Sequence, residues 1–90
     1  MKFEYDEKKS NINKEKHGID FVEAQKLWQN EDALIVPANV VDGEIRYALI
    51  SFYKGKCFVA IYTLRDGLYR IISVRRCRKN EERSYENYNR

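Results

Sequence analysis

The arginines are the residues of this chain whose type and spacing point most directly to chemistry. Only Arg46 precedes residue 65, and the others follow in the C-terminal part of the 90-residue chain: Arg65, Arg70, Arg75, Arg76, Arg78, Arg83 and Arg90. Residues 65–90 carry eight Lys and Arg against four Asp and Glu, whereas residues 1–64 carry nine against ten. The modest overall charge of +3 therefore conceals a strongly basic C-terminal region.

An arginine guanidinium presents five donors in a planar fork, which matches phosphate oxygens better than the point charge of lysine does. This distribution predicts an anionic partner, and RNA is favoured over a small phosphate ligand. The alternative is a solvated surface of local ion pairs, such as Arg78 with Glu82 and Arg83 with Glu86 at helical spacing. For Arg78 and the residues after it, we favour this alternative.

Residues 44–76 must position most of these arginines, and we expect them to form an antiparallel meander. Two-residue hairpin signals at Lys54-Gly55 and Asp66-Gly67 separate three runs rich in β-branched and aromatic residues. These runs are Ile45–Phe52, Cys57–Leu64 and Tyr69–Val74. The last strand is expected to continue to Arg76, and packing alone gives no reason for Arg75 inside it.

The N-terminal segment is predicted to contain a strand and a polar helix. Residues 2–5 alternate between polar and apolar, as in a short strand near a sheet edge. Asp6 stands at the N-cap of a helix over residues 7–16, and Gly18 suits a left-handed C-cap. This helix has few apolar residues, so its stability rests mainly on the caps and on helix propensity.

A second helix opens at Asp20 with a signature that resembles a capping box. Its apolar stripe must face the sheet and comprises Phe21, Ala24, Leu27 and Trp28. We interpret Trp28 as a core or rim residue rather than as a platform for a nucleobase. Residues 33–36 then read as a strand that Pro37 stops.

The C-terminal segment, Cys77–Asn89, is highly charged and reads as a C-terminal helix or a frayed tail. Together the elements predict one domain over residues 1–90 of α+β class. It is a small antiparallel β-sheet packed against two N-terminal helices, with a C-terminal helix. At this length and 43% hydrophobic composition, a single core is expected.

The two faces of the meander follow from a two-residue loop at Lys54-Gly55. One face is aliphatic and charged at one end, and it pairs Glu44 with Arg65; the other is aromatic. We expect the aliphatic face, Ala48, Ile50, Val59 and Ile61, to seat the helices, and the aromatic face to be the ligand side. A bulge in the last strand would swap its assignment, so whether Arg75 shares a face with Arg65 stays open.

Cys57 and Cys77 lie in apolar or basic surroundings without Cys-x-x-Cys spacing. In a secreted protein the two cysteines could form one disulfide. Without an export signal or a long apolar run, we instead expect a cytoplasmic protein with reduced, buried thiols and no membrane association. One histidine and two scattered cysteines offer no ligand cluster, so neither a metal site nor any other cofactor is expected.

The chain resembles the BrnT family of ribonuclease toxins over nearly its whole length. The likeness is carried by Phe3-x-Tyr-Asp-Glu-x-Lys-x-x-x-Asn13, Lys16-His17-Gly18-Ile-Asp-Phe21-x-x-Ala24, Gly43-Glu44-x-Arg46, Tyr62-Thr63-x-Arg65, Arg70-Ile71-Ile72-Ser73-x-Arg75 and Glu82-Arg83-x-Tyr85. The second and fifth blocks, in this order and spacing, are together fairly specific. Tyr5 departs from the family, which usually has Trp at that position.

The resemblance implies a RelE-like fold and metal-independent cleavage of RNA. It also implies a BrnA-like antitoxin that dimerises, blocks the RNA-cleaving surface and represses its own operon through DNA binding. We therefore expect a toxin–antitoxin complex, a heterotetramer built on the antitoxin dimer, that reaches operator DNA only through the antitoxin.

Such cleavage uses the RNA 2′-hydroxyl as nucleophile, so it requires a proton acceptor, cations for the phosphorane and a donor for the leaving oxygen. Arg65 and Arg75 are the candidates for phosphate and transition-state stabilisation. Glu44 and His17 are candidates for acid–base roles, and Tyr85 for an auxiliary donor. The remaining candidates would hold the RNA backbone without reading its sequence. They are Arg46, Arg70, Arg76 and Lys79.

Each assignment has a structural alternative. His17 fits a helix C-terminus, where its charge complements the helix dipole; Glu44 fits a salt bridge to Arg65; Tyr85 fits a packing contact of the last helix. At the level of the whole protein, the alternatives are a non-catalytic module that binds RNA or antitoxin, and a small domain whose arginines pair only with an acidic protein.

Overall fold

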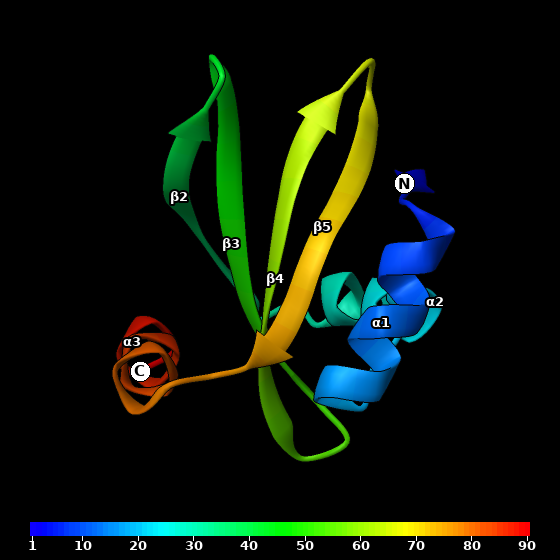
Figure 1. Cartoon of the computed structure of the whole chain (residues 1–90). Helices are drawn as coiled ribbons and strands as arrows, with labels where there is room; N and C mark the ends of the chain where they lie inside the picture. Colours follow the sequence, from blue (N-terminus) through cyan, green and yellow to red (C-terminus); the bar gives the residue numbers. More distant parts are fainter.

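The computed structural model describes all residues from Met1 to Arg90 and consists of one five-stranded sheet with helices on both faces (Figure 1). The strands are β1 (Phe3–Glu4), β2 (Leu34–Val41), β3 (Glu44–Tyr53), β4 (Lys56–Arg65) and β5 (Leu68–Arg76). The helices are α1 (Glu7–His17), α2 (Phe21–Ala24), which continues as the 3₁₀ turn η1 (Gln25–Gln29), and α3 (Lys79–Tyr88). The strand order is β1-β5-β4-β3-β2, with β1 parallel to β5 and the other neighbours antiparallel. The predicted α+β class is confirmed.

The meander forms as predicted because its turns have the required backbone. Lys54 and Gly55 have φ of 51° and 75°, and Asp66 and Gly67 have φ of 53° and 77°, the positive values that a type I′ hairpin demands. The register between β3 and β4 also matches the prediction, with Ala48 opposite Ile61. A third hairpin of the same kind joins β2 to β3 at Asp42 and Gly43, with φ of 50° and 76°, and the sequence analysis did not identify it.

The prediction that Pro37 stops a strand at residue 36 is wrong. β2 continues to Val41, Pro37 lies opposite Tyr47, and the register shifts between Pro37 and Asn39. Proline is tolerated here because β2 is an edge strand, where a missing N–H donor removes no bond that a second neighbour needs.

The N-terminal helices are capped as predicted and fastened to the sheet by a buried side chain. Asp6 accepts a hydrogen bond from the Lys9 N–H, and Asp20 accepts one from the Glu23 N–H at 2.7 Å. Asn13 of α1 is 6% exposed. Its amide donates to the Val74 carbonyl at 2.9 Å and accepts from the Val74 N–H at 3.1 Å, which links α1 to β5.

The two faces of the sheet are covered unequally, and the predicted seat of the helices is wrong. The N-terminal helices pack on the aromatic face, where the main core forms: Ile19, Phe21, Ala24, Leu27, Leu49, Phe58, Ala60, Tyr62, Ile71 and Val74. The aliphatic face carries the smaller cluster of Ala48, Ile50, Cys57 and Val59, against which only α3 packs, through Tyr85. The large side chains of α2 and η1 pack against the large side chains of the aromatic face, whereas the aliphatic face carries smaller ones.

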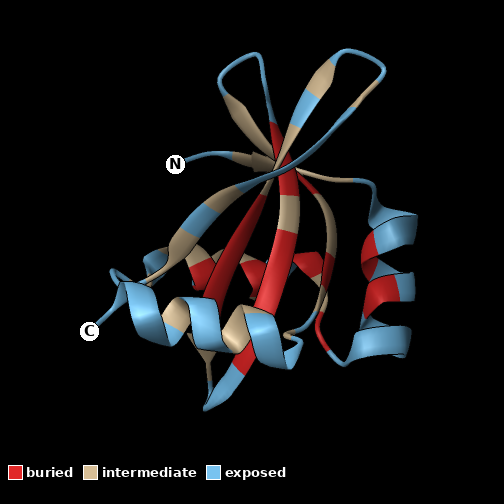
Figure 2. Cartoon of the chain, turned by 90° about the vertical axis from the view of Figure 1, so that its left-hand side faces the viewer, coloured by how far each residue is buried: buried red, intermediate tan, exposed pale blue.

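Burial is concentrated in the middle of the sheet, whereas the tips of the β2–β3 and β4–β5 hairpins extend beyond the helices and diverge (Figure 2). The ladder between β3 and β4 ends at Arg46 opposite Thr63 at this end of the sheet. We call this end the open end; the Lys54-Gly55 hairpin forms the opposite end. None of the helices has the length and the apolar character that crossing a membrane requires.

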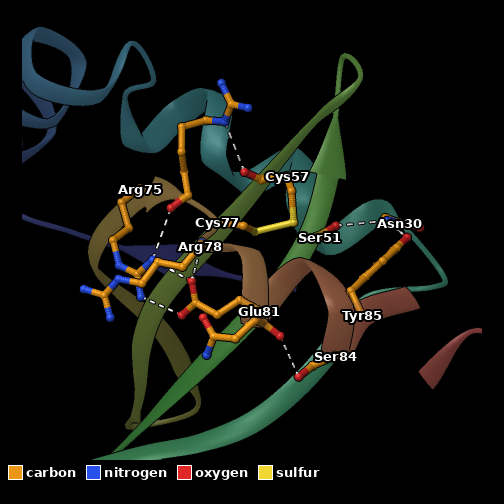
Figure 3. The surroundings of a disulfide bond; sticks show 11 residues. Asn30, Ser51, Cys57, Arg75, Cys77, Arg78, Glu81, Ser84 and Tyr85 are labelled. Atoms are coloured by element: carbon orange, nitrogen blue, oxygen red, sulfur yellow. Dashed lines mark hydrogen bonds and ion pairs between the residues drawn. A yellow bond between two sulfur atoms is a disulfide. The ribbon is translucent and has the colours of Figure 1, made fainter. Parts of the chain in front are cut away.

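Cys57 and Cys77 form a disulfide, so the prediction of reduced thiols is wrong (Figure 3). Cys57 begins β4 and Cys77 directly follows β5, and the Cys77 N–H donates to the Cys57 carbonyl at 2.9 Å. This pairing holds the two Cα atoms 5.3 Å apart, within the range that a disulfide spans. The spacing of the two cysteines in the sequence does not reveal this contact, because they meet only when β5 pairs with β4.

Candidate nucleic-acid interface

Five of the nine predicted site residues lie on one face of the sheet, and a bulge in β5 is the reason that Arg75 is among them. Tyr62 lies opposite Ile71, but Ile61 lies opposite Ser73, so one residue of β5 is skipped. Beyond this bulge, Arg75 lies opposite Val59 and shares its face. The face, which we call the arginine face, contains Glu44, Arg46, Thr63, Arg65, Arg70 and Arg75.

Three of these arginines gather at the open end. Arg46 and Arg70 lie on either side of Thr63, opposite it on β3 and β5, which places their Cα atoms about 10 Å apart. Arg65 is two residues beyond Thr63 on the same strand, at about 7 Å. Thr63 is 1% exposed, and its hydroxyl donates to the Ile45 carbonyl at 2.7 Å. The three arginines are therefore neighbours of the buried and hydrogen-bonded Thr63.

The carboxylates at this end leave one arginine free. Arg65 donates to Glu44 Oε2 from Nη2 at 2.8 Å, and this contact raises the pKa of Arg65. Arg70 lies 3.8 Å from Glu4, a longer and weaker pair. Arg46 forms no ion pair, and its Nε is buried without a hydrogen-bond partner. The Arg46 donors that remain for an incoming anion are its two terminal nitrogens, which form no hydrogen bond or ion pair within the chain.

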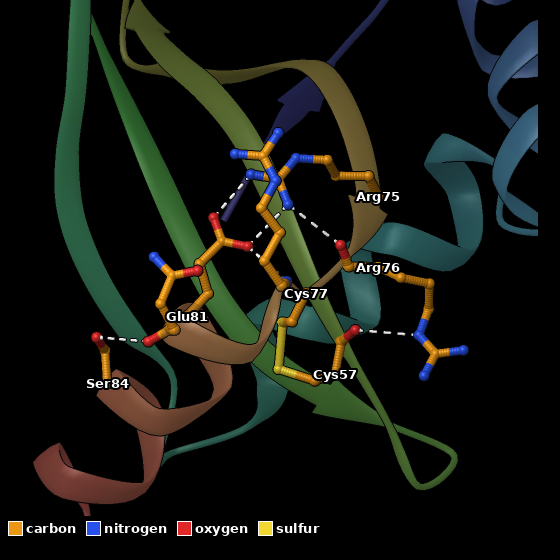
Figure 4. Close-up of polar contacts among 8 residues, drawn as sticks. Cys57, Arg75, Arg76, Cys77, Glu81 and Ser84 are labelled. Carbon is orange, nitrogen blue, oxygen red and sulfur yellow. Dashed lines mark hydrogen bonds and ion pairs between the residues drawn. A yellow bond between two sulfur atoms is a disulfide. The ribbon is translucent and has the colours of Figure 1, made fainter.

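Arg75 is engaged instead in a bidentate pair with α3 (Figure 4). Its Nη1 and Nη2 donate to the two carboxylate oxygens of Glu81 at 2.8 and 2.7 Å. Glu81 Oε1 also accepts from the Arg78 N–H at 2.7 Å. The hydrogen bonds between the two side chains lower the pKa of Glu81 and raise that of Arg75, and partial burial opposes both shifts. In this arrangement Arg75 fastens α3 to the sheet.

Tyr85 lies on the same face but at its covered end. Its ring packs on Phe52 with centroids 5.0 Å apart. Its hydroxyl accepts a hydrogen bond from Asn30 at 3.1 Å, and Asn30 also donates to Ser51 at 3.0 Å (Figure 3). The contacts match the packing alternative that the sequence left open for this residue.

His17, Arg76 and Lys79 do not join the cluster. His17 is exposed at the end of α1, next to Gly18, which lines a hollow with Lys54 and Lys56 at the opposite end of the sheet. Arg76 lies over the Phe58 ring on the aromatic face, at 5.7 Å from the ring centroid. Lys79 is exposed on α3. The pairs expected along α3, Arg78 with Glu82 and Arg83 with Glu86, do not form either.

The two arginines favoured for phosphate stabilisation are too far apart to act on one phosphate. Arg75 lies opposite Val59, and Arg65 is six residues further along β4, which corresponds to about 20 Å. Because strand side chains stand roughly perpendicular to the sheet, the two guanidinium groups remain well separated, and Arg75 is also held by Glu81. The candidates therefore divide into an open-end group around Arg65 and an α3 group around Arg75.

Three participants were missed by the sequence analysis. Glu81 neutralises Arg75, Thr63 lies between the arginines, and Asp42-Gly43 makes the hairpin that carries Glu44. Only the hairpin had a sequence signal, the Asp-Gly dipeptide. No group of three or more His, Cys, Asp or Glu side chains is arranged to hold a metal ion.

A small α+β protein with clustered arginines on one sheet face has features that are typical of proteins that bind a polyanion. The model of the BrnT family, described as the ribonuclease toxin of a type II toxin–antitoxin system, matches residues 5–81. The chain belongs to this family. Membership implies a ribonuclease toxin with an RNA substrate and an antitoxin partner. No curated protein matches the chain.

Proposed function

We propose that this chain is a metal-independent endoribonuclease that cleaves RNA at the open end of the arginine face. The observation that carries the proposal is the gathering of Arg46, Arg65 and Arg70 around Thr63, with the Glu44 carboxylate beside them. Arginines at neighbouring positions of one sheet face can direct their guanidinium groups to the oxygens of one phosphate and of its pentacoordinate transition state.

The reaction follows from the groups present. The 2′-oxygen attacks phosphorus, the bond from phosphorus to the 5′-oxygen breaks, and the products are a 2′,3′-cyclic phosphate and a 5′-hydroxyl. Glu44 is the acceptor for the 2′-hydroxyl proton, because it is the carboxylate next to Arg65. An arginine cannot give up its proton to the leaving oxygen. Protonation of that oxygen is therefore left to water or to the carboxylic acid that Glu44 has become.

The other candidates take supporting positions in this proposal. Arg75 and Tyr85 act through α3, which they attach to the sheet, and Arg75 would face RNA only if Glu81 moved away. His17, Arg76 and Lys79 lie outside the cluster and contribute at most long-range attraction for the RNA backbone.

The test is cleavage of a fluorescent single-stranded RNA by the purified chain in the presence of EDTA. We expect products ending in a 2′,3′-cyclic phosphate, and loss of cleavage by Arg65→Ala and by Glu44→Gln. Arg83→Ala, on the exposed side of α3, is the matched control and should retain activity. Binding of RNA without cleavage would instead favour a non-catalytic module.

We also propose that a BrnA-like antitoxin dimer neutralises this surface in a heterotetramer. The exposed open end has no other cover within the chain, which supports an external partner there. Both encounters would take place in the cytoplasm, where reductants would act on the Cys57–Cys77 disulfide. Mixing the chain with its antitoxin should abolish RNA cleavage, and the mass of the complex measured by light scattering gives the stoichiometry.

A further inference from the structure

A hollow at the open end has no role in the proposed reaction. It has a volume of about 430 Å³ and is lined by residues of β3, β4 and the β2–β3 turn. The β2–β3 and β4–β5 hairpins diverge at this end of the sheet (Figure 1). Its lining includes the Asp42-Gly43 turn and the side chains of Glu44, Ile45, Tyr47 and Leu64. The hollow exists because the β3–β4 ladder ends at Arg46 and Thr63, after which the two hairpins separate.

Three of the seven residues that line this hollow are hydrophobic, Ile45, Tyr47 and Leu64, and the others are polar or glycine. Ile45 is 52% exposed and Leu64 is 51% exposed, so both would gain from being covered. Tyr47 is half-buried, and its ring stacks on that of Tyr62 with centroids 5.5 Å apart. Tyr62 is itself 4% exposed and packs on Trp28. Tyr47 is thus held as a rigid aromatic surface at the edge of the hollow.

The hollow adjoins the arginine face through neighbouring residues of the same strands. Successive side chains of a strand point to opposite faces, so Glu44 and Arg65 lie on the arginine face while Ile45 and Leu64 point to the other. Glu44 Oε2 takes both contacts from Arg65, and its Oε1 has no partner. A nucleotide whose phosphate meets Arg65 therefore has the apolar side chain of Leu64 one residue away along β4, and the unpaired Oε1 of Glu44 beside it.

We propose that this hollow binds the unpaired nucleobase of the nucleotide that supplies the attacking 2′-hydroxyl. The base stacks against Tyr47 between Ile45 and Leu64, which orients its ribose toward Glu44 and its 3′-phosphate toward Arg65. Single-stranded RNA is bound by such a combination of cationic groups and an aromatic surface. This inference rests on the proposed function and makes the hollow the subsite that selects the base on the 5′ side of the cut.

The test uses an uncleavable dinucleotide with a 2′-deoxy sugar in its first residue, and a matched analogue that lacks the first base. In spectra of the methyl-labelled chain, the dinucleotide should shift the methyl resonances of Ile45 and Leu64, whereas the analogue should not. Tyr47→Ala should weaken binding of the dinucleotide about tenfold, the typical loss of a stacking partner, and leave binding of the analogue unchanged.

Leu64→Ala provides a second variant that keeps the fold, because Leu64 is largely exposed. It should also weaken the dinucleotide selectively, whereas Val22→Ala, 60% exposed on α2, should not. Equal affinity for the dinucleotide and its analogue, or shifts confined to the arginine face, would overturn the inference even if RNA is cleaved. Selective binding of the base without any cleavage would show that the hollow binds a base, but would refute the proposed enzyme and overturn the place of this base beside the cut.

Discussion

Reduction of the Cys57–Cys77 disulfide should destabilise the folded chain mainly by increasing the conformational entropy of the unfolded state. The bridge closes a loop of 20 residues, for which loop entropy predicts a loss of about 3 kcal/mol on reduction. The folded state should tolerate the change, because Cys57 is 2% exposed and a thiol is at home beside Ala48, Ile50 and Val59. The main-chain bond between Cys77 and Cys57 also remains.

Urea unfolding followed by Trp28 fluorescence, with and without a reductant, measures this loss. With a denaturant dependence of about 1 kcal/mol/M for a small domain, the midpoint should fall by about 2–3 M. The Cys57→Ala/Cys77→Ala double variant is the control and should not respond to reductant. If both thiols become free to alkylating reagent after unfolding but the midpoint stays the same, then the bridge contributes nothing and the loop-entropy argument fails.

Three further predictions concern the contacts that position the arginine face. Asn13→Ala should lower the free energy of unfolding by about 3 kcal/mol, because it leaves buried main-chain groups of Val74 unpaired. Asn11→Ala, exposed on the same helix, is the control. Equal denaturation midpoints for the two variants would contradict this prediction. The pKa of Glu81 is lowered in the folded state, so its pair with Arg75 should stabilise the folded chain fully at pH values above the ordinary pKa of 4.5. This contribution should be lost as the pH falls through the lowered pKa. The difference in unfolding free energy between the wild type and Glu81→Gln, measured against pH, should therefore vanish in acid. Gly67→Ala should lower the free energy of unfolding by about 1 kcal/mol, because alanine is strained at the Gly67 φ of 77°. A clash adds nothing to this cost, since an added Cβ meets no atom within 4 Å. An unchanged melting temperature would contradict the turn assignment.

Local signals in the sequence were sufficient for the elements that depend on neighbours in the chain. The caps at Asp6 and Gly18, the hairpins at Lys54-Gly55 and Asp66-Gly67, and the β3–β4 register all formed as predicted. Each depends on the conformational preferences of one or two residues, which the chain carries wherever it is placed. The same reasoning applied to Asp42-Gly43 would have found the third hairpin.

The candidate site was only partly accessible in this way. The pairing of Glu44 with Arg65 followed from a turn length and was correct. The bulge in β5 opposite Ile61, by contrast, contains no proline or glycine that would have predicted it from the sequence. It nevertheless determines that Arg75 lies on the same face as Arg65. The partner of Arg75, Glu81, depends on where α3 lands after β5, which is a long-range packing outcome.

The sequence by itself determined the class of the fold, the meander and the basic character of its last strands, because composition, periodicity and turn chemistry are local properties. Only the tertiary structure decided which face the helices cover, that the two cysteines meet, and that His17 and Tyr85 lie away from Arg65. These facts depend on contacts between residues far apart in the chain, where side-chain volume and strand order act together.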